Sequence, residues 1–339
     1  MTPFRYNGWI LGNFYKDLLF VFSPGFIGVA LSALIPQQTI FFILWAFFVT
    51  VLVDSGHVFT TAWRTFFRKE ERTSSPIYWI VPTLIVLIVF MWVKFKIPYI
   101  WSFVVYATVY HHMTQFYGFL RWYQKLNGKR LILSAYFLFA LMIIPFVLLH
   151  FRALPKHGLY TDQDIFFYPN PHFFKTGLVV YGLVAGVWLF WEAVSVWRRT
   201  FEIHCFLAVL CPAFLYGACF LLGQNMIQVL FPLLLSHGIP YVAVMGLSLP
   251  RLDRRLFSSM PKALAILAAT AVIGSVIEKI YENFVITIDN EYTRSGLSSL
   301  QALLIGIYLV PVLCHYIFDG VIWKSTHKDA KLIYAKEIS

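Results

Sequence analysis

Long apolar runs are the feature that most constrains the fold of this chain. Runs of roughly 20 residues recur from one end to the other, separated by short polar stretches. A run of about this length crosses a bilayer as a helix, because a helix satisfies its own backbone hydrogen bonds there. The sequence therefore predicts an all-α, polytopic transmembrane helical bundle of about ten spans, forming one integral-membrane domain. The expected spans are residues 17–36, 38–61, 77–96, 98–120, 131–151, 173–197, 201–222, 226–249, 261–280 and 299–323.

The charged residues are few, and their positions predict the topology. Only 13% of the 339 residues are charged, 59% are hydrophobic, and the net charge is +11. Basic residues gather after every second span, which under the positive-inside rule places both termini in the cytoplasm. This placement accounts for the positive charge without nucleic-acid binding and indicates a multi-pass protein of a membrane such as the bacterial inner membrane. The remaining parts are an amphipathic N-terminal segment (1–16), two longer outer loops (152–172 and 281–298) and a cytoplasmic tail (324–339).

Two pairs of ionisable side chains stand inside predicted spans at helical spacing. His315 and Asp319 are four residues apart in the last span, and Asp54 and His57 are three apart in the second. Each spacing places both side chains on one helix face, about 6 Å apart along the axis for the first pair. Because ionisable groups inside a membrane cost free energy, they are expected to serve a function.

Further polar residues fall at a similar depth in other spans. The fourth span carries His111 and His112, with Gln115 one turn after the first, and the eighth carries His237 with Tyr241. At ~1.5 Å per residue, the histidines His112 and His237 lie ~13–21 Å above the first basic residue at the inner end of their span. We expect these groups to converge in the cytoplasmic half of the bilayer. The histidines left out of this group are His150, His157, His172, His204 and His327.

The chemistry of these side chains indicates a metal site. Imidazole and carboxylate groups suit iron, zinc or copper, and non-haem iron in particular. The four cysteines show no CxxC spacing and are expected to be buried apolar residues. We therefore expect a mono- or dinuclear iron centre, with zinc or copper as the other candidates. The expected metal ligands are Asp54, His57, His111, His112, His237, His315 and Asp319.

The histidine motifs resemble those of a known class of enzymes. DxxH, HHxxQ, HxxxY and HxxxD lie on four predicted helices at a shared depth. This pattern is similar to that of integral-membrane metalloenzymes that act on lipids, and among them to the Brp/Blh-type carotene dioxygenases. The resemblance implies a membrane non-haem iron oxygenase, hydroxylase or desaturase with a lipidic or isoprenoid substrate. Asp319 stands where a second histidine would match more closely, and the HxxxxH and HxxHH boxes of membrane fatty-acid desaturases are absent. The substrate itself is therefore left open.

Other polar residues near the predicted site are expected to have supporting roles. Gln115, Tyr241 and Glu192 are expected to orient the imidazoles or to take part in catalysis. Arg64 and Arg121, at the inner ends of their spans, are expected to hold an anionic head group. The expected partners are a lipid or isoprenoid substrate from the bilayer and a separate electron donor, because no redox domain is evident in the sequence.

Three other functions fit the same polar residues. A haem-binding membrane protein would use facing histidines as axial ligands. A proton-coupled transporter would use the carboxylates and imidazoles as a proton relay, and an acyltransferase would need only one buried histidine. Metal analysis and the visible spectrum separate these functions, since a Soret band indicates haem and iron without that band indicates an oxygenase.

Overall fold

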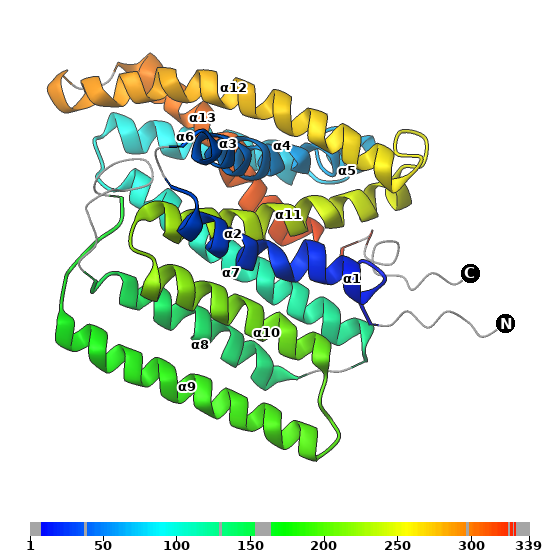
Figure 1. Cartoon of the computed structure of the whole chain (residues 1–339). Helices are drawn as coiled ribbons and strands as arrows, with labels where there is room; N and C mark the ends of the chain where they lie inside the picture. The colour runs from blue at the N-terminus through cyan, green and yellow to red at the C-terminus, as the bar shows by residue number, and fades with distance from the viewer. Residues whose placement is uncertain are drawn as a thin grey trace. The chain divides into compact units, whose positions relative to one another are not determined.

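The computed structural model shows a chain built from helices (Figure 1). It describes residues 8–36, 39–128, 131–152, 164–295, 298–324, 326–327 and 329, and every regular element within them is a helix, which confirms the predicted class. The α-helices are α1 (Phe14–Asp17), α2 (Ser23–Leu34), α3 (Ile40–Phe47), α4 (Gly56–Thr60), α5 (Lys69–Ser74), α6 (Ile77–Lys94), α7 (Ile100–Leu126), α8 (Ile132–Leu149), α9 (Pro171–Trp197), α10 (Ile203–Tyr216), α11 (Met226–Leu252), α12 (Met260–Ser295) and α13 (Ser299–Ile322). They are interrupted by the π-helices η1 (Leu18–Phe22), η2 (Phe48–Ser55) and η4 (Gly217–Leu222) and by the 3-10 helix η3 (Thr61–Trp63).

Nine helices within the described residues are long and apolar enough to cross a membrane. They account for every predicted span except the fourth, residues 98–120. That segment does form a helix, α7, of 27 residues. Its histidines, Gln115 and the basic residues near its C-terminal end leave it too polar to be counted among the nine. The polytopic bundle is therefore confirmed, while the cytoplasmic position of the termini stays a prediction.

The outer loop predicted for residues 281–298 is wrong for most of its length. Helix α12 continues through this stretch to Ser295. No glycine or proline occurs between Gly274 and Gly296, so the sequence contains no strong helix breaker there. Residues 153–163 of the other predicted outer loop lie outside the described part of the chain.

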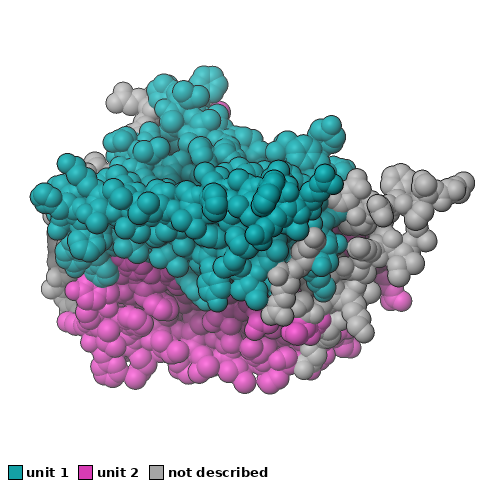
Figure 2. Space-filling model, turned by 90° about the horizontal axis from the view of Figure 1, so that it is seen from below, with its two compact units in different colours: residues 1–43, 109–240 teal, residues 44–108, 241–339 magenta. Residues whose placement is uncertain are grey.

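The chain divides into two compact units whose segments alternate along the sequence (Figure 2). Unit 1 comprises residues 1–43 and 109–240, and unit 2 comprises residues 44–108 and 241–339. The divisions fall within α3, α7 and α11, so these helices contribute residues to both units. The single integral-membrane domain expected from the sequence stays a prediction.

In unit 1, helix α8 packs against both α9 and α10 (Figure 1). The turn before α1 is fixed by Asp17, a fully buried carboxylate. Its oxygens accept hydrogen bonds from the backbone N–H groups of Ile10 (2.8 Å) and Leu11 (2.7 Å) and from the Tyr123 hydroxyl (2.6 Å). These donors compensate the burial of the carboxylate. The N-terminal segment is thereby tied to α7, and residues 1–7 lie outside the described part.

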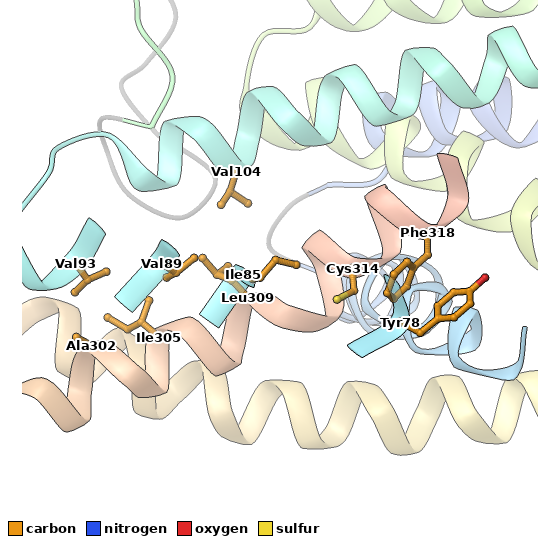
Figure 3. Packing of buried hydrophobic residues seen from close by; sticks show 10 residues of the cluster. All are labelled: Tyr78, Ile85, Val89, Val93, Val104, Ala302, Ile305, Leu309, Cys314 and Phe318. Atoms are coloured by element: carbon orange, nitrogen blue, oxygen red, sulfur yellow. The ribbon is translucent and has the colours of Figure 1, made fainter. Parts of the chain in front are cut away.

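In unit 2, an apolar seam joins α6 to α13 (Figure 3). Its members recur mostly three, four or seven residues apart, which places them on one face of each helix. A Cβ on Gly306 would lie 2.9 Å from the Val86 carbonyl oxygen, so only glycine allows this close approach. The seam fixes the helix that carries His315 and Asp319. Its buried residues are Tyr78, Ile85, Val89, Val93, Val104, Ala302, Ile305, Leu309, Cys314 and Phe318.

Helix α12 holds the second span in place within the same unit. A Cβ on Gly56 would lie 2.7 Å from the Cβ of Ala271, so glycine permits the close contact of α4 with α12. One turn beyond α4, Trp63 Nε1 donates a hydrogen bond to Thr270 Oγ1 at 2.9 Å. These two contacts flank His57 in sequence and fix the segment that carries it.

Candidate metal centre

His57 is buried on α4, directly after the π-helix η2, with 2% of its surface exposed. Its Nδ1 lies 2.8 Å from the carbonyl oxygen of Val53. A carbonyl oxygen only accepts hydrogen bonds, so Nδ1 carries the proton of the neutral ring and Nε2 carries the lone pair. The backbone of the second span thus sets His57 as an electron-pair donor through Nε2.

A chain of hydrogen bonds sets the proton position on His315, which is 1% exposed. His315 Nδ1 lies 2.7 Å from Thr61 Oγ1, and Thr61 Oγ1 lies 2.6 Å from the Tyr241 hydroxyl oxygen. The Tyr241 hydroxyl donates to Asp319 Oδ1 at 3.2 Å. Because that bond uses the Tyr241 proton, Thr61 donates to Tyr241 and accepts from His315 Nδ1–H. His315 therefore also presents its lone pair on Nε2.

The two imidazoles of unit 2 lie close enough to serve one metal ion. Their ring centroids are 4.8 Å apart with planes at 78°, and each ring offers a ligand atom within 4.8 Å of the other. Asp319 Oδ2 lies 3.7 Å from His315 Nδ1. Two ligand atoms of one ion stand at most ~4.2 Å apart when the bonds are ~2.0–2.1 Å long. The donor set of two imidazoles and a supporting carboxylate fits iron or zinc.

Arg64 binds the C-terminal end of α13. Its side chain is 1% exposed, its Nη2 donates to the Ile322 carbonyl oxygen at 2.9 Å, and its guanidinium lies 4.2 Å from the centroid of the Trp323 ring. Arg64 therefore caps the last turn of α13. Arg121 donates to Gln124 Oε1 on its own helix. The head-group contacts expected of the two arginines stay predictions.

In unit 1, Gln115 holds the imidazole of His237 from two sides. Gln115 Oε1 accepts a hydrogen bond from His237 Nδ1, and Gln115 Nε2 donates to the His237 carbonyl oxygen at 3.1 Å. His237 is therefore a third imidazole whose lone pair is on Nε2. His111 packs against it with ring centroids 4.9 Å apart. Gln115 thereby orients His237, and its role in a metal site stays a prediction.

His112, also in unit 1, uses both ring nitrogens in hydrogen bonds. The Ser236 hydroxyl donates to the Leu233 carbonyl oxygen at 2.8 Å, so Ser236 Oγ accepts from His112 Nε2 at 3.1 Å. His112 Nδ1 then accepts from the Tyr216 hydroxyl at 2.8 Å. This leaves His112 no lone pair for a metal, so we omit it from the ligands proposed below. Sequence reasoning misses both partners of His112. No motif links Tyr216 to His112, and the only indication for Ser236 is its position next to His237.

Asp54 and Glu192 are the remaining carboxylate candidates. Asp54 is half-buried in η2. The Ser195 hydroxyl donates to the Glu192 carbonyl oxygen at 2.7 Å and lies 3.3 Å from the Glu192 carboxylate. Neither carboxylate belongs to a group of three potential ligands within 4.8 Å in the described part of the chain. His204 packs on Trp9 with ring centroids 4.1 Å apart.

The fold and these side chains define a polytopic helical membrane protein with buried histidine and carboxylate groups able to hold a metal ion. Comparisons with known protein families, with curated proteins and with solved structures gave no match. The resemblance to Brp/Blh-type carotene dioxygenases therefore stays an expectation from the histidine motifs. Function has to be argued from the side chains themselves.

Proposed function

We propose that the protein is an integral-membrane, metal-dependent oxidoreductase in which His57 and His315 hold a non-haem iron. One observation carries this proposal: two buried imidazoles 4.8 Å apart each donate Nδ1–H to an oxygen and keep the Nε2 lone pair. Metal-binding histidines almost always donate their second nitrogen in this way, because the bond fixes the tautomer and the ring orientation. His150 makes the same kind of Nδ1 bond to a backbone carbonyl, so the tautomers support a shared ion only together with the closeness of the two rings.

The side chains of unit 2 would position the metal and control one proton. When bound, iron would supply the one-electron and O₂ chemistry that amino-acid side chains lack. Asp319, acting through Tyr241 and Thr61, would hold the imidazole proton of His315 on Nδ1. Burial of both imidazoles would exclude water from reactive species.

A lipidic or isoprenoid substrate suits a site of this kind. Apolar substrates and O₂ both concentrate in the hydrocarbon phase, where the spans that carry the two histidines are expected to lie. The similarity of the histidine motifs to Brp/Blh-type carotene dioxygenases favours an isoprenoid. We place the site in the cytoplasmic half of a membrane such as the bacterial inner membrane, with a separate protein as electron donor. The expectation that His237 belongs to the same centre is tested by the metal content of His237→Ala.

The same hydrogen-bond chain favours a second candidate function, proton transfer in a transporter. Asp319, Tyr241, Thr61 and His315 form an unbroken series of hydrogen bonds between two ionisable groups. Intramembrane chains of carboxylate and imidazole groups serve as proton relays in transporters. A relay needs no metal, so metal content separates the two functions.

The test is metal analysis of the purified full-length protein, together with its visible spectrum. We expect iron without a Soret band in the wild type and loss of that iron in His57→Ala and His315→Ala. His150→Ala is the matched control, because His150 Nδ1 bonds to the Phe146 carbonyl oxygen of its own helix at 2.9 Å. Wild-type protein that binds no metal would overturn the oxidoreductase and favour the relay.

A further inference from the structure

A second group of potential ligands follows the two helical segments that carry His57 and His315. Glu71 of α5, His327 and Asp329 belong to unit 2 and offer ligand atoms within 4.8 Å of one another. His327 Nε2 lies 3.5 Å from Glu71 Oε2, and His327 Nδ1 lies 3.8 Å from Asp329 Oδ2. Two ligands of a tetrahedral ion with bonds of ~2.0–2.1 Å stand ~3.3–3.4 Å apart. The 3.5 Å from His327 Nε2 to Glu71 Oε2 is close to this spacing, whereas the 3.8 Å to Asp329 involves the other ring nitrogen, which would not bind the same ion. The measure common to all three side chains is that each offers one ligand atom within 4.8 Å of the others.

Both carboxylates are buried and held in orientation. Glu71 is 1% and Asp329 is 5% exposed. The Tyr78 hydroxyl donates to Glu71 Oε2 at 3.1 Å, and Arg68 donates to both oxygens of Asp329 through Nη1 and Nη2. Arg68 Nη1 also lies 3.4 Å from Glu71 Oε1, so one guanidinium contacts both carboxylates. A carboxylate has about four lone-pair positions, so a carboxylate can accept such bonds and bind a metal ion at the same time. Hydrogen-bonded carboxylates of this kind are typical of metal ligands.

The imidazole of His327 is poorly satisfied by its hydrogen bonds. Its Nδ1 accepts from the Asp329 backbone N–H at 3.3 Å, at the long end of the usual range. The 3.5 Å from Nε2 to Glu71 Oε2 is too long for a well-formed hydrogen bond. Replacing either contact by a bond to a metal ion would therefore lose little hydrogen-bond energy.

We propose that Glu71, His327 and Asp329 form a second metal site, which takes a divalent transition ion of the Zn²⁺ class. One imidazole with two carboxylates suits zinc or manganese, whereas calcium and magnesium select oxygen ligands alone. Glu71 follows the span of His57, and the other two follow the span of His315. The ion would therefore tie the segment after α13 to the segment after the second span, as a structural site.

An ionic cluster without metal is the competing explanation. Arg68, which contacts both carboxylates, would then balance their charge. The two explanations differ in metal binding, which makes the choice measurable on the full-length protein.

The experiment uses full-length protein with the His315→Ala substitution, stripped of metal and kept in detergent. Its affinity for Zn²⁺ is measured by competition with a chromophoric chelator. The His315→Ala substitution removes the site of the proposed function, so the two ideas fail separately. We expect one equivalent of Zn²⁺ to remain bound and Glu71→Gln to weaken it at least 100-fold. Glu70→Gln is the matched control, because Glu70 is the adjacent carboxylate and its side chain is 70% exposed. It should leave the affinity within about twofold.

His327→Gln gives a second measurement and should weaken Zn²⁺ binding to the same extent as Glu71→Gln. Size-exclusion profiles of the metal-free variants show which of them fold, and only the Zn²⁺ affinities of folded variants are compared. If the His315→Ala protein binds no Zn²⁺, or if the Glu71, His327 and Glu70 variants bind it equally, the second site does not exist. Variants that lose thermal stability without any change in Zn²⁺ binding would identify an ionic cluster and also overturn the proposal.

Discussion

Replacing Thr61 by valine is the sharpest test of the proposed centre, because it removes one hydroxyl and keeps the shape of the side chain. Thr61 Oγ1 lies 2.7 Å from His315 Nδ1 and 2.6 Å from the Tyr241 hydroxyl oxygen. The change leaves both groups buried without this partner, at a cost of ~1–3 kcal/mol for each. It also releases the proton of His315 from Nδ1, so the lone pair no longer has to be on Nε2.

The expected effect on metal affinity follows from this geometry. Loss of a hydrogen-bond partner behind a ligating histidine typically weakens metal binding ~10–100-fold. That range equals ~1.4–2.7 kcal/mol, which agrees with the cost of one unsatisfied buried polar group. We therefore expect Thr61→Val to bind Co²⁺ or Fe²⁺ ~10–100-fold more weakly in competition with a chelator, and Thr61→Ser to restore most of the affinity.

Thr65→Val is the matched control for this measurement. Thr65 is fully buried, and its hydroxyl donates only to the Thr61 carbonyl oxygen at 3.0 Å within the bonds described. The same substitution there removes a buried hydroxyl of the same segment without touching His315. Its metal affinity should stay within about threefold of the wild type. Equal affinities of the Thr61→Val and Thr65→Val proteins would refute the role assigned to the hydrogen-bond chain.

Four further predictions follow from the same structure. Asp319→Asn should lower metal affinity or turnover ~10–100-fold, measured as bound iron and product in one preparation, and full loading with full activity would contradict it. His112→Gln should keep wild-type metal content, since both nitrogens of His112 are used in hydrogen bonds. Burial lowers the pKa of His150, so on acidification the unfolded chain binds the proton at a higher pH than the folded chain. The free energy of unfolding should therefore decrease as the pH falls below about 6.5. His150→Gln should reduce this decrease, measured by thermal unfolding at about pH 7.5 and 5.5. A reporter fused after Lys129 should be cytoplasmic and one within residues 160–170 should not, and the reverse result would remove the depth argument.

The spans could be predicted from sequence because hydrophobic length is a local property. Each run carries its own signal, and nine helices within the described residues confirm it. Helix α7 shows a limit of this prediction, because its candidate site residues, the histidines and Gln115, lower its mean hydropathy. The end of α12 shows another limit. Polar residues beyond residue 280 suggest a loop, although nothing before Gly296 breaks the helix.

The candidate site could be predicted only in part, because ligand competence depends on hydrogen-bond partners. His57 and His112 look alike in sequence, yet one bonds to a backbone carbonyl and the other to two side-chain hydroxyls. Tyr216 comes from a distant helix and carries no motif that points to His112. His327 was excluded as a tail residue, and only the folded chain brings it to Glu71. Spacing along one helix predicts shared faces, whereas the tautomers of His315 and His112 depend on contacts between segments far apart in the sequence.

The spacing of His57 and His315 also bears on the choice between haem and non-haem iron. Axial ligands of a haem stand on opposite sides of the iron, with their nitrogens ~4 Å apart and their rings pointing away from each other. Each ring centroid lies farther from the iron than its ligand nitrogen does, so the two centroids are farther apart than the ~4 Å between the nitrogens. The observed 4.8 Å, with planes at 78°, is too short for this arrangement and suits two ligands on the same side of an ion. Ligands on one side leave other positions of the metal open, which an oxygenase needs for its substrates and an electron-transfer haem does not. We therefore expect no haem between His57 and His315, and a Soret band lost in His57→Ala or His315→Ala would prove the reasoning wrong.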